Sequence, residues 1–169
     1  MSPDSSAVAR TLLAAWNARD LPRFLGLLTE DVEWYDPAMV QPPARGRDAV
    51  QAFAESVLHA FPDFSYEIRE PVCVSADGTR CVVPWRITAT HTATLTPPGY
   101  VPTNRQLVVD GLDELDLRGG RVARILTCFD AIAAAEQLLG ITLRPPSRSW
   151  RQRAMVGLQR IAAARARGL

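Results

Sequence analysis

The chain has no lysine, only three cysteines and no long hydrophobic run. The few cysteines and the lack of a hydrophobic run each exclude a class of protein. An odd number of cysteines, at positions 73, 81 and 128, fits neither a disulfide framework nor a thiolate metal site. The first residues lack the apolar stretch of a signal peptide. Arg, Asp, Pro or Gly interrupts every apolar segment before it reaches the roughly 20 residues of a membrane span. We therefore expect a soluble, reduced, cytoplasmic protein.

Charge is distributed unevenly along the chain. All 19 basic residues are Arg, and seven of them follow Gly140, where no acidic residue occurs. The remaining 12 Arg face 18 acidic residues, so the rest of the chain carries a formal charge of −6. An Arg-only, Ala-rich composition is typical of coding bias rather than of binding, and we expect no nucleic-acid partner.

Motifs for several chemistries are also missing. The two histidines stand 32 residues apart among scattered acids, which is not the spacing of a metal site. The sequence contains no Gly-rich phosphate loop and no nucleophile elbow. We therefore expect no bound metal.

The apolar periodicity indicates an α+β domain. A length of 169 residues fits one compact domain, which we place at residues 1–143, followed by an Arg-rich extension at 144–169 that we expect to be helical. Three segments have helical spacing, namely residues 8–16, 21–28 and 48–60. Strand-like segments follow the short strand Val32 to Asp36, at residues 65–74, 80–95, 106–117 and 122–129. Helices followed by hairpins predict a strongly curved antiparallel sheet wrapped around the third helix, leaving a conical cavity.

Two lone ionisable residues, His91 and Asp130, stand on otherwise apolar or small-residue strand segments. A carboxylate at the end of the run that closes with Phe129 faces desolvation, which raises its pKa toward values useful for acid/base chemistry. Asp130 is thus a candidate proton shuttle. The alternative is a helix cap, because the sequence Ala131 to Leu139 is helix-forming and Asp is a favoured N-cap residue.

Alternation along the strands places further side chains. His91 shares a face with Trp85, Ile87 and Ala89, while Arg86 points the other way, as a surface or dimer-contact residue. On the strand at 106–117, the apolar face includes Asp113, which makes it a candidate second carboxylate. The neighbouring acids on the opposite face are most simply solvated.

Several segments together resemble the SnoaL-like polyketide cyclase family of the nuclear-transport-factor-2-like superfamily, across roughly residues 6 to 140. The resemblance depends on their order and spacing rather than on any single one. The segments are LLTEDVEWYDP at 27–37, GRDAVQAF at 46–53, AFPDFSYEI at 60–68, ATHT at 89–92, PTNR at 102–105 and GGRVARILTCFD at 119–130, with LLG at 138–140.

The resemblance implies site residues and a reaction. Asp130 matches the family's general acid/base, and Asp36 matches a strand-end position that supplies a second polar contact, although it is also a natural turn residue before Pro37. His91 matches a family histidine that shares a proton or binds a substrate carbonyl, and a structural histidine is equally compatible. The implied chemistry needs no cofactor: a carboxylate removes a proton next to a carbonyl, and the substrate closes a ring by intramolecular aldol or conjugate addition.

The expected ligand is a small, apolar, polyketide-like ring or chain. Its binding is expected to involve Trp34, Tyr35, Phe53, Trp85 and Leu126, with Trp16, Phe24 and Phe61 as further lining. The loop from Thr96 to Thr103 is a possible substrate-facing lid. The family also implies a homodimer formed through the open sheet face.

Two other functions remain open at this stage. The same fold serves epoxide hydrolases, isomerases, dehydratases and cofactor-free hydroxylases, and it also serves binding or assembly modules without activity. Two carboxylates straddling a water would favour epoxide opening, whereas one carboxylate with His91 would favour proton abstraction. An exposed or closed-off Asp130 with an ordinary pKa would favour the binding module. The stripe of Trp150, Leu158 and Ile161 in the extension favours docking on its own domain or a twin subunit over a membrane surface or a partner enzyme.

Overall fold

The computed structural model describes residues 4–167. They fall into two compact units, the first ending at Leu139 and the second beginning at Gly140. Within the described residues, no helix has both the length and the apolar character that a membrane crossing requires. The second unit contains helix α5 (Trp150–Arg167), which confirms the predicted helical extension.

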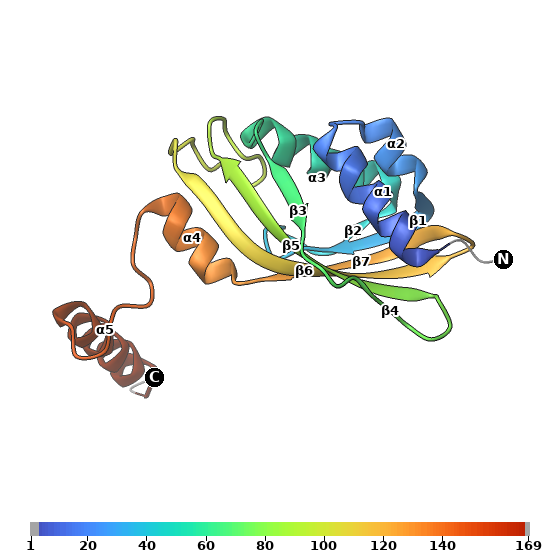
Figure 1. Ribbon diagram of the computed structural model, residues 1–169. Coiled ribbons are helices and arrows are strands. Elements are labelled where there is room, and N and C mark those ends of the chain that lie inside the picture. The colour runs from blue at the N-terminus through green and yellow to red at the C-terminus, as the bar shows by residue number, and fades with distance from the viewer. Residues whose placement is uncertain (1–3, 168–169) are drawn as a thin grey trace. The chain divides into compact units, whose positions relative to one another are not determined.

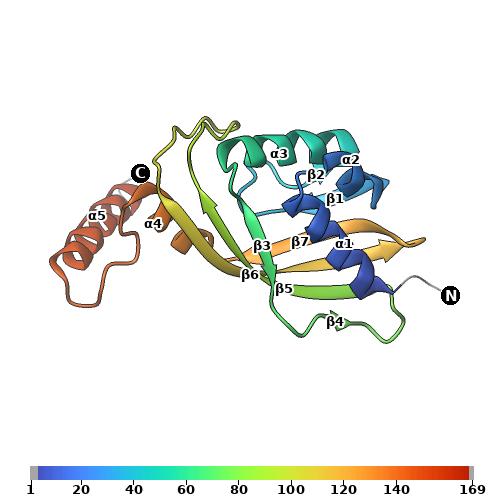
Figure 2. The ribbon, with the colours of Figure 1, turned by 45° about the horizontal axis from the view of Figure 1, so that its top comes forward.

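Three helices cover one face of the sheet in the first unit (Figures 1 and 2). Asp4 begins α1 (Ser5–Asn17) by accepting a hydrogen bond from the Ser6 N–H, and Asp20 begins α2 (Leu21–Gly26) by accepting from Arg23 N–H. Helix α3 (Gly46–Ala60) agrees with the predicted third helix and buries Val50, Ala54 and Val57 at helical spacing. Helix α4 (Ala131–Leu139) follows the last strand.

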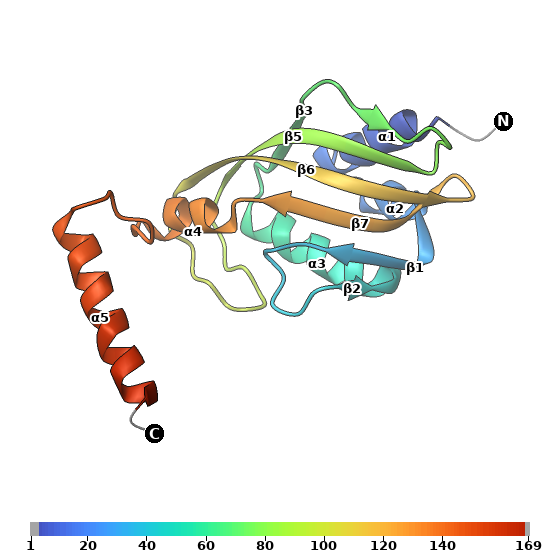
Figure 3. The same cartoon turned by 90° about the horizontal axis from the view of Figure 1, so that it is seen from below.

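Seven strands form one curved sheet in the order β2-β1-β7-β6-β5-β3, with β4 paired to β5 beside this path. Figure 3 shows the strands from the side opposite to the helices. The strands are β1 (Leu28–Tyr35), β2 (Ala44–Arg45), β3 (Ser65–Ile68), β4 (Cys73–Val74), β5 (Arg80–Thr90), β6 (Gln106–Arg118) and β7 (Arg121–Phe129). Long hairpins join β5 to β6 and β6 to β7, as the period-two pattern predicted.

Two details of the sheet differ from the sequence-based expectation. The segment 65–74 is not one strand: Pro71 lacks a backbone N–H and separates β3 from β4. Strand β1 pairs with β7 in parallel, whereas every other pairing in the sheet of the described chain is antiparallel. The parallel pair arises because β1 precedes the hairpins and joins the sheet beside its last strand.

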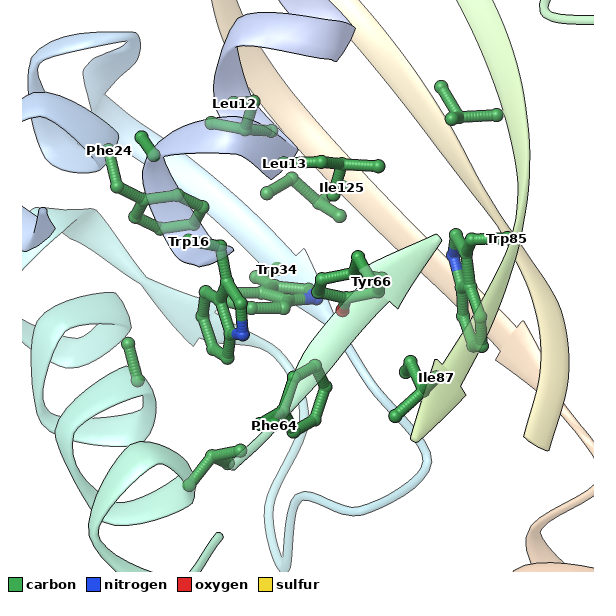
Figure 4. Packing of buried hydrophobic residues seen from close by; sticks show 14 of the residues in the cluster. Leu12, Leu13, Trp16, Phe24, Trp34, Phe64, Tyr66, Trp85, Ile87 and Ile125 are labelled. Atoms are coloured by element: carbon green, nitrogen blue, oxygen red, sulfur yellow. The ribbon is translucent and has the colours of Figure 1, made fainter. Parts of the chain in front are cut away.

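An aromatic cluster centred on Trp16 fills the space between α1, α2 and the sheet (Figure 4). The Trp16 ring makes edge contacts with Phe24 and Trp34, with centroids 5.4 and 5.7 Å apart. It makes similar contacts with Phe64 and Tyr66, at 5.5 and 6.0 Å. Edge-to-face packing of this kind adds to the hydrophobic stabilisation and fixes ring orientation.

Candidate active site

A cavity of about 490 Å³ lies inside the first unit. Its walls come from the inner face of the sheet, from α1, α3 and α4, and from the loops after β1 and β5. Most of the lining is apolar, and the lining residues that carry polar side-chain groups are Trp16, Trp34, Asp36, Tyr66, His91, Tyr100 and Thr127. An apolar cavity with a small number of polar groups is typical of a small-molecule site.

Asp36 follows the last residue of β1 and faces the cavity. Its side chain is 9% exposed and accepts a hydrogen bond from the Ala38 N–H at 2.7 Å. Burial raises the pKa of Asp36 to about 6, although the Ala38 hydrogen bond opposes this shift. The sequence left two roles open for Asp36, a turn residue before Pro37 and a polar contact in the cavity. In the structure Asp36 has both positions.

Asp113 lies in β6, on the buried face that alternation predicted. Its side chain is 3% exposed and accepts a hydrogen bond at 2.8 Å from the hydroxyl of Thr127, its cross-strand partner in β7. Thr127 in turn accepts a bond from the Trp34 indole N–H at 2.9 Å. Asp113 thus stands behind Thr127, which lines the cavity while Asp113 does not.

Burial is the main cause that raises the pKa of Asp113, to about 7. The charge of Asp36 raises it further, whereas the Thr127 hydroxyl and the nearby Trp85 indole lower it. The Thr127 hydroxyl has the larger effect, because the Trp85 N–H does not reach full hydrogen-bond geometry toward any group. Burial therefore raises the pKa of both carboxyls, and the charge of Asp36 adds a smaller increase at Asp113.

Tyr66 and His91 are further polar residues of the lining. Burial, then the charges of Asp113 and Asp36, raise the pKa of Tyr66 well above its ordinary value, so its hydroxyl stays protonated. His91 is 3% exposed and stacks on Phe61, with centroids 5.1 Å apart. Its Nδ1 lies 3.5 Å from the Thr103 hydroxyl, while its Nε2 is buried without a hydrogen-bond partner.

The structure places Asp130 apart from these groups. Its side chain is exposed and accepts a hydrogen bond from the Ala133 N–H at 2.9 Å, which is the geometry of a helix cap at the start of α4. Phe129 and Ala131 on either side line the cavity, but Asp130 does not. The catalytic role that the resemblance implies for Asp130 stays a prediction.

The expected substrate-binding residues divide in two. Trp34 and Phe53 line the cavity, as do Trp16 and Phe61. Tyr35 and Leu126 are partners across β1 and β7 and are not among the lining residues, because alternation turns them away from Trp34 and Thr127. Trp85 is fully buried in the core above Gly111. Phe24 packs behind Trp16.

Sequence reasoning did not single out Thr127 or Tyr66. For Thr127 a signal existed, since it alternates with Ile125 and Phe129 on the inner face of β7. For Tyr66 the short strand β3 gives too little periodicity. Arg86 lies on the outer face as expected and pairs with Asp110 through contacts of 2.8 and 2.7 Å.

No group of three or more His, Cys, Asp or Glu side chains suited to a metal ion occurs among residues 4–167. The lining contains carboxyl, imidazole, hydroxyl and indole groups, which together can transfer protons and bind a polar atom of an otherwise apolar ligand.

The fold and cavity define an α+β protein in which helices and a curved sheet enclose an apolar cavity. Residues 9–125 match the model of the SnoaL-like domain, and the chain belongs to this family. None of the curated proteins matches the sequence.

Solved structures share the fold at low identity. A proposed polyketide cyclase from Pseudomonas putida KT2440 is 21% identical with a TM-score of 0.69, over 79% of this chain and 97% of that one. AclR, a proposed hydroxylase from Streptomyces galilaeus, is 21% identical with a TM-score of 0.68, over 99% of this chain and 98% of that one. IdmH, a proposed polyketide cyclase from Streptomyces antibioticus, is 22% identical with a TM-score of 0.65, over 81% and 99%.

Proposed function

We propose that the protein is a cofactor-independent acid/base enzyme of natural-product biosynthesis. It abstracts a proton next to a carbonyl of an apolar, polyketide-like substrate, which then closes a ring by intramolecular aldol or conjugate addition. Membership of the SnoaL-like family and the apolar cavity support this class of reaction. The observation that carries the proposal is the buried Asp36 carboxyl in the cavity wall, with the buried Asp113 carboxyl behind Thr127.

Asp36 acts as the general base because it is the carboxyl that lines the cavity. A pKa of about 6 makes it a stronger base than an ordinary carboxylate, yet leaves most of it ionised at neutral pH. Asp113 retains a proton more readily, with its pKa near 7. Near neutrality the pair therefore contains one base and one acid, with Thr127 between Asp113 and the cavity.

Hydrogen-bond donors then stabilise the enolate that proton abstraction creates. The Tyr66 hydroxyl stays protonated and lines the cavity, and His91 presents an imidazole nitrogen without a protein partner. Apolar walls such as Phe53 and Phe61 hold the substrate folded, so that the carbon nucleophile lies close to its electrophile.

The same geometry separates this proposal from its alternatives. Epoxide opening needs two carboxylates on one water, but Thr127 separates Asp113 from the cavity. The exposure of Asp130 fits a binding module. A binding module, however, does not need the two buried carboxyls of Asp36 and Asp113, whose burial costs stability. We therefore favour proton abstraction.

The test is deuterium incorporation into aryl ketones, beginning with 1-tetralone in D₂O and followed by mass spectrometry. We expect the wild-type protein to accelerate exchange next to the carbonyl and Asp36→Asn to lose about 10²-fold or more of that acceleration. The rate should rise with pH up to about 6 to 7, because the base must be ionised.

Asp110→Asn is the matched control, since Asp110 is an exposed carboxyl on the outer face of β6. It should exchange like the wild type. A folded Asp36→Asn variant with wild-type exchange would contradict the proposal. If the wild-type protein accelerates exchange in none of the aryl ketones, the binding module is favoured instead.

A further inference from the structure

We propose that the indole N–H of Trp16 is a binding subsite for an acceptor oxygen of the ligand, so that the cavity selects apolar molecules with a carbonyl or phenolic oxygen. The inference deepens the proposed function, because it concerns the same cavity. It concerns binding, however, and can be tested without any turnover.

The first observation is an unused donor. Trp16 lines the cavity and is 2% exposed, and its Nε1 is buried with no hydrogen-bond partner in the described chain. A buried N–H without a partner is costly and uncommon, and an indole nitrogen can only donate. The missing partner is therefore an acceptor atom, and the cavity is where a ligand can supply it.

Comparison with the other buried tryptophans of the first unit isolates Trp16. Trp34 also lines the cavity, but its N–H donates to Thr127 at 2.9 Å and is occupied. Trp85 has no full hydrogen bond, but it faces Asp113 and does not line the cavity. Among these three indoles, Trp16 alone combines a free N–H with a place in the cavity wall.

The second observation is rigidity. Four aromatic rings hold Trp16 with centroids 5.4 to 6.0 Å away, in the edge-on packing that Figure 4 shows. A side chain held on so many sides cannot rotate to find another partner, so its donor is preorganised for an incoming oxygen. The Asp36 carboxyl lines the same cavity.

His91 is the rival donor. Its Nε2 is also buried and unpartnered in the cavity wall, but an imidazole nitrogen donates in one tautomer and accepts in the other. His91 therefore suits proton exchange, whereas the indole has a single fixed role. Variants of both residues are needed to assign the oxygen contact.

The experiment compares 9-fluorenone with fluorene, two rigid tricyclic molecules that differ by one carbonyl oxygen and have no proton next to a carbonyl to exchange. Dissociation constants are measured for wild type, Trp16→Phe, His91→Phe and Phe64→Leu. Trp16→Phe keeps an aromatic ring and removes the donor. Phe64→Leu is the packing control, since Phe64 lines the cavity and contacts Trp16 but has no polar atom.

We expect wild type to bind fluorenone about three to ten times more tightly than fluorene, the effect of one net hydrogen bond. Trp16→Phe should bind the two equally, while Phe64→Leu should weaken both and keep their ratio. The carbonyl stretch of bound fluorenone should lie lower in wild type than in Trp16→Phe.

Three results would overturn the inference: equal binding of both probes by wild type, failure to bind either probe, or loss of the preference in His91→Phe while Trp16→Phe keeps it. None of these depends on deuterium exchange. A protein that prefers fluorenone but does not exchange 1-tetralone would retain the Trp16 subsite and lose the proposed enzyme activity.

Discussion

Asp113 is a carboxyl that folding places where its charge is unfavourable. Its native pKa of about 7 lies above the ordinary value of 3.8, so the folded protein binds the Asp113 proton more tightly than the unfolded chain does. Between about pH 4 and pH 7 the unfolded chain has already lost that proton, and the free energy of unfolding therefore falls as pH rises. Above pH 7 both states are ionised and the loss is complete.

We therefore expect Asp113→Asn to stabilise the protein at pH 8 by roughly 2 kcal/mol and to change little at pH 4. The amide oxygen can still accept the Thr127 hydrogen bond, so packing is preserved. Urea unfolding at the two pH values measures the difference. Asp110→Asn, which loses an exposed pair with Arg86, should show no such gain at pH 8. A variant less stable than wild type at pH 8 would mean that the charge of Asp113 is stabilising.

At the scale of elements, one glycine in β6 makes room for the ring of its partner Trp85 in β5. Trp85 and Gly111 are cross-strand partners, and the indole occupies the space that a side chain at 111 would need. A Cβ added to Gly111 would lie 2.2 Å from Trp85 Cη2 and 2.6 Å from the Cys128 carbonyl oxygen. Neither atom can move freely, because one belongs to a fully buried ring and the other to the backbone of β7.

Gly111→Ala should therefore lower the free energy of unfolding by about 1 to 3 kcal/mol through overpacking. Gly26→Ala is its control, since nothing lies within 4 Å of a Cβ at that helical position and alanine favours helix. Denaturant unfolding of both variants is the measurement. Equal stability of Gly111→Ala and wild type would show that β5 and β6 can separate locally at no cost.

The elements that the sequence predicted well are those with local signals. Helical spacing from 48 to 60 was sufficient for α3, and the alternation through Trp85 and Ile87 was sufficient for β5. The predicted end of that strand at residue 95 was wrong, because β5 ends at Thr90 and His91 follows it. The parallel pairing of β1 with β7 has no local signal, because it joins residues about 90 positions apart. The contact between Thr127 and Asp113 was hidden for a different reason, because it depends on the register of two neighbouring strands.

The candidate site shows the same division. Alternation correctly placed Asp113 on the buried face, and the strand-end position of Asp36 pointed to the cavity. Local sequence around Asp130 contained two opposed signals, an apolar strand before it and a helix after it. The structure shows the cap, since the carboxyl accepts the Ala133 N–H at an exposed position, while the catalytic role stays a prediction. Which signal dominates depends on how the chain turns there, and that is set by tertiary packing.

At the scale of the whole molecule, the cavity and the hydrophobic core belong to the first unit. Every residue that lines the cavity precedes Gly140, as does every residue of the main hydrophobic core cluster. The second unit instead contains seven Arg and no acidic residue. Its removal would change the formal charge from +1 to −6 without taking a side chain from the cavity or from that core.

A chain ending at Gly140 should therefore fold and bind 9-fluorenone within about twofold of the full-length affinity, with a melting temperature lower by no more than a few degrees. At neutral pH the shorter chain should bind an anion-exchange resin strongly, whereas the full-length chain should bind only a cation-exchange resin, and weakly. Calorimetry and the fluorenone titration make the comparison. A chain ending at Arg153 keeps four of the seven Arg residues and is the control of intermediate charge. Unfolding of the shorter chain, or loss of its affinity with the fold intact, would show that residues 141–169 support the first unit, which its self-contained core does not require.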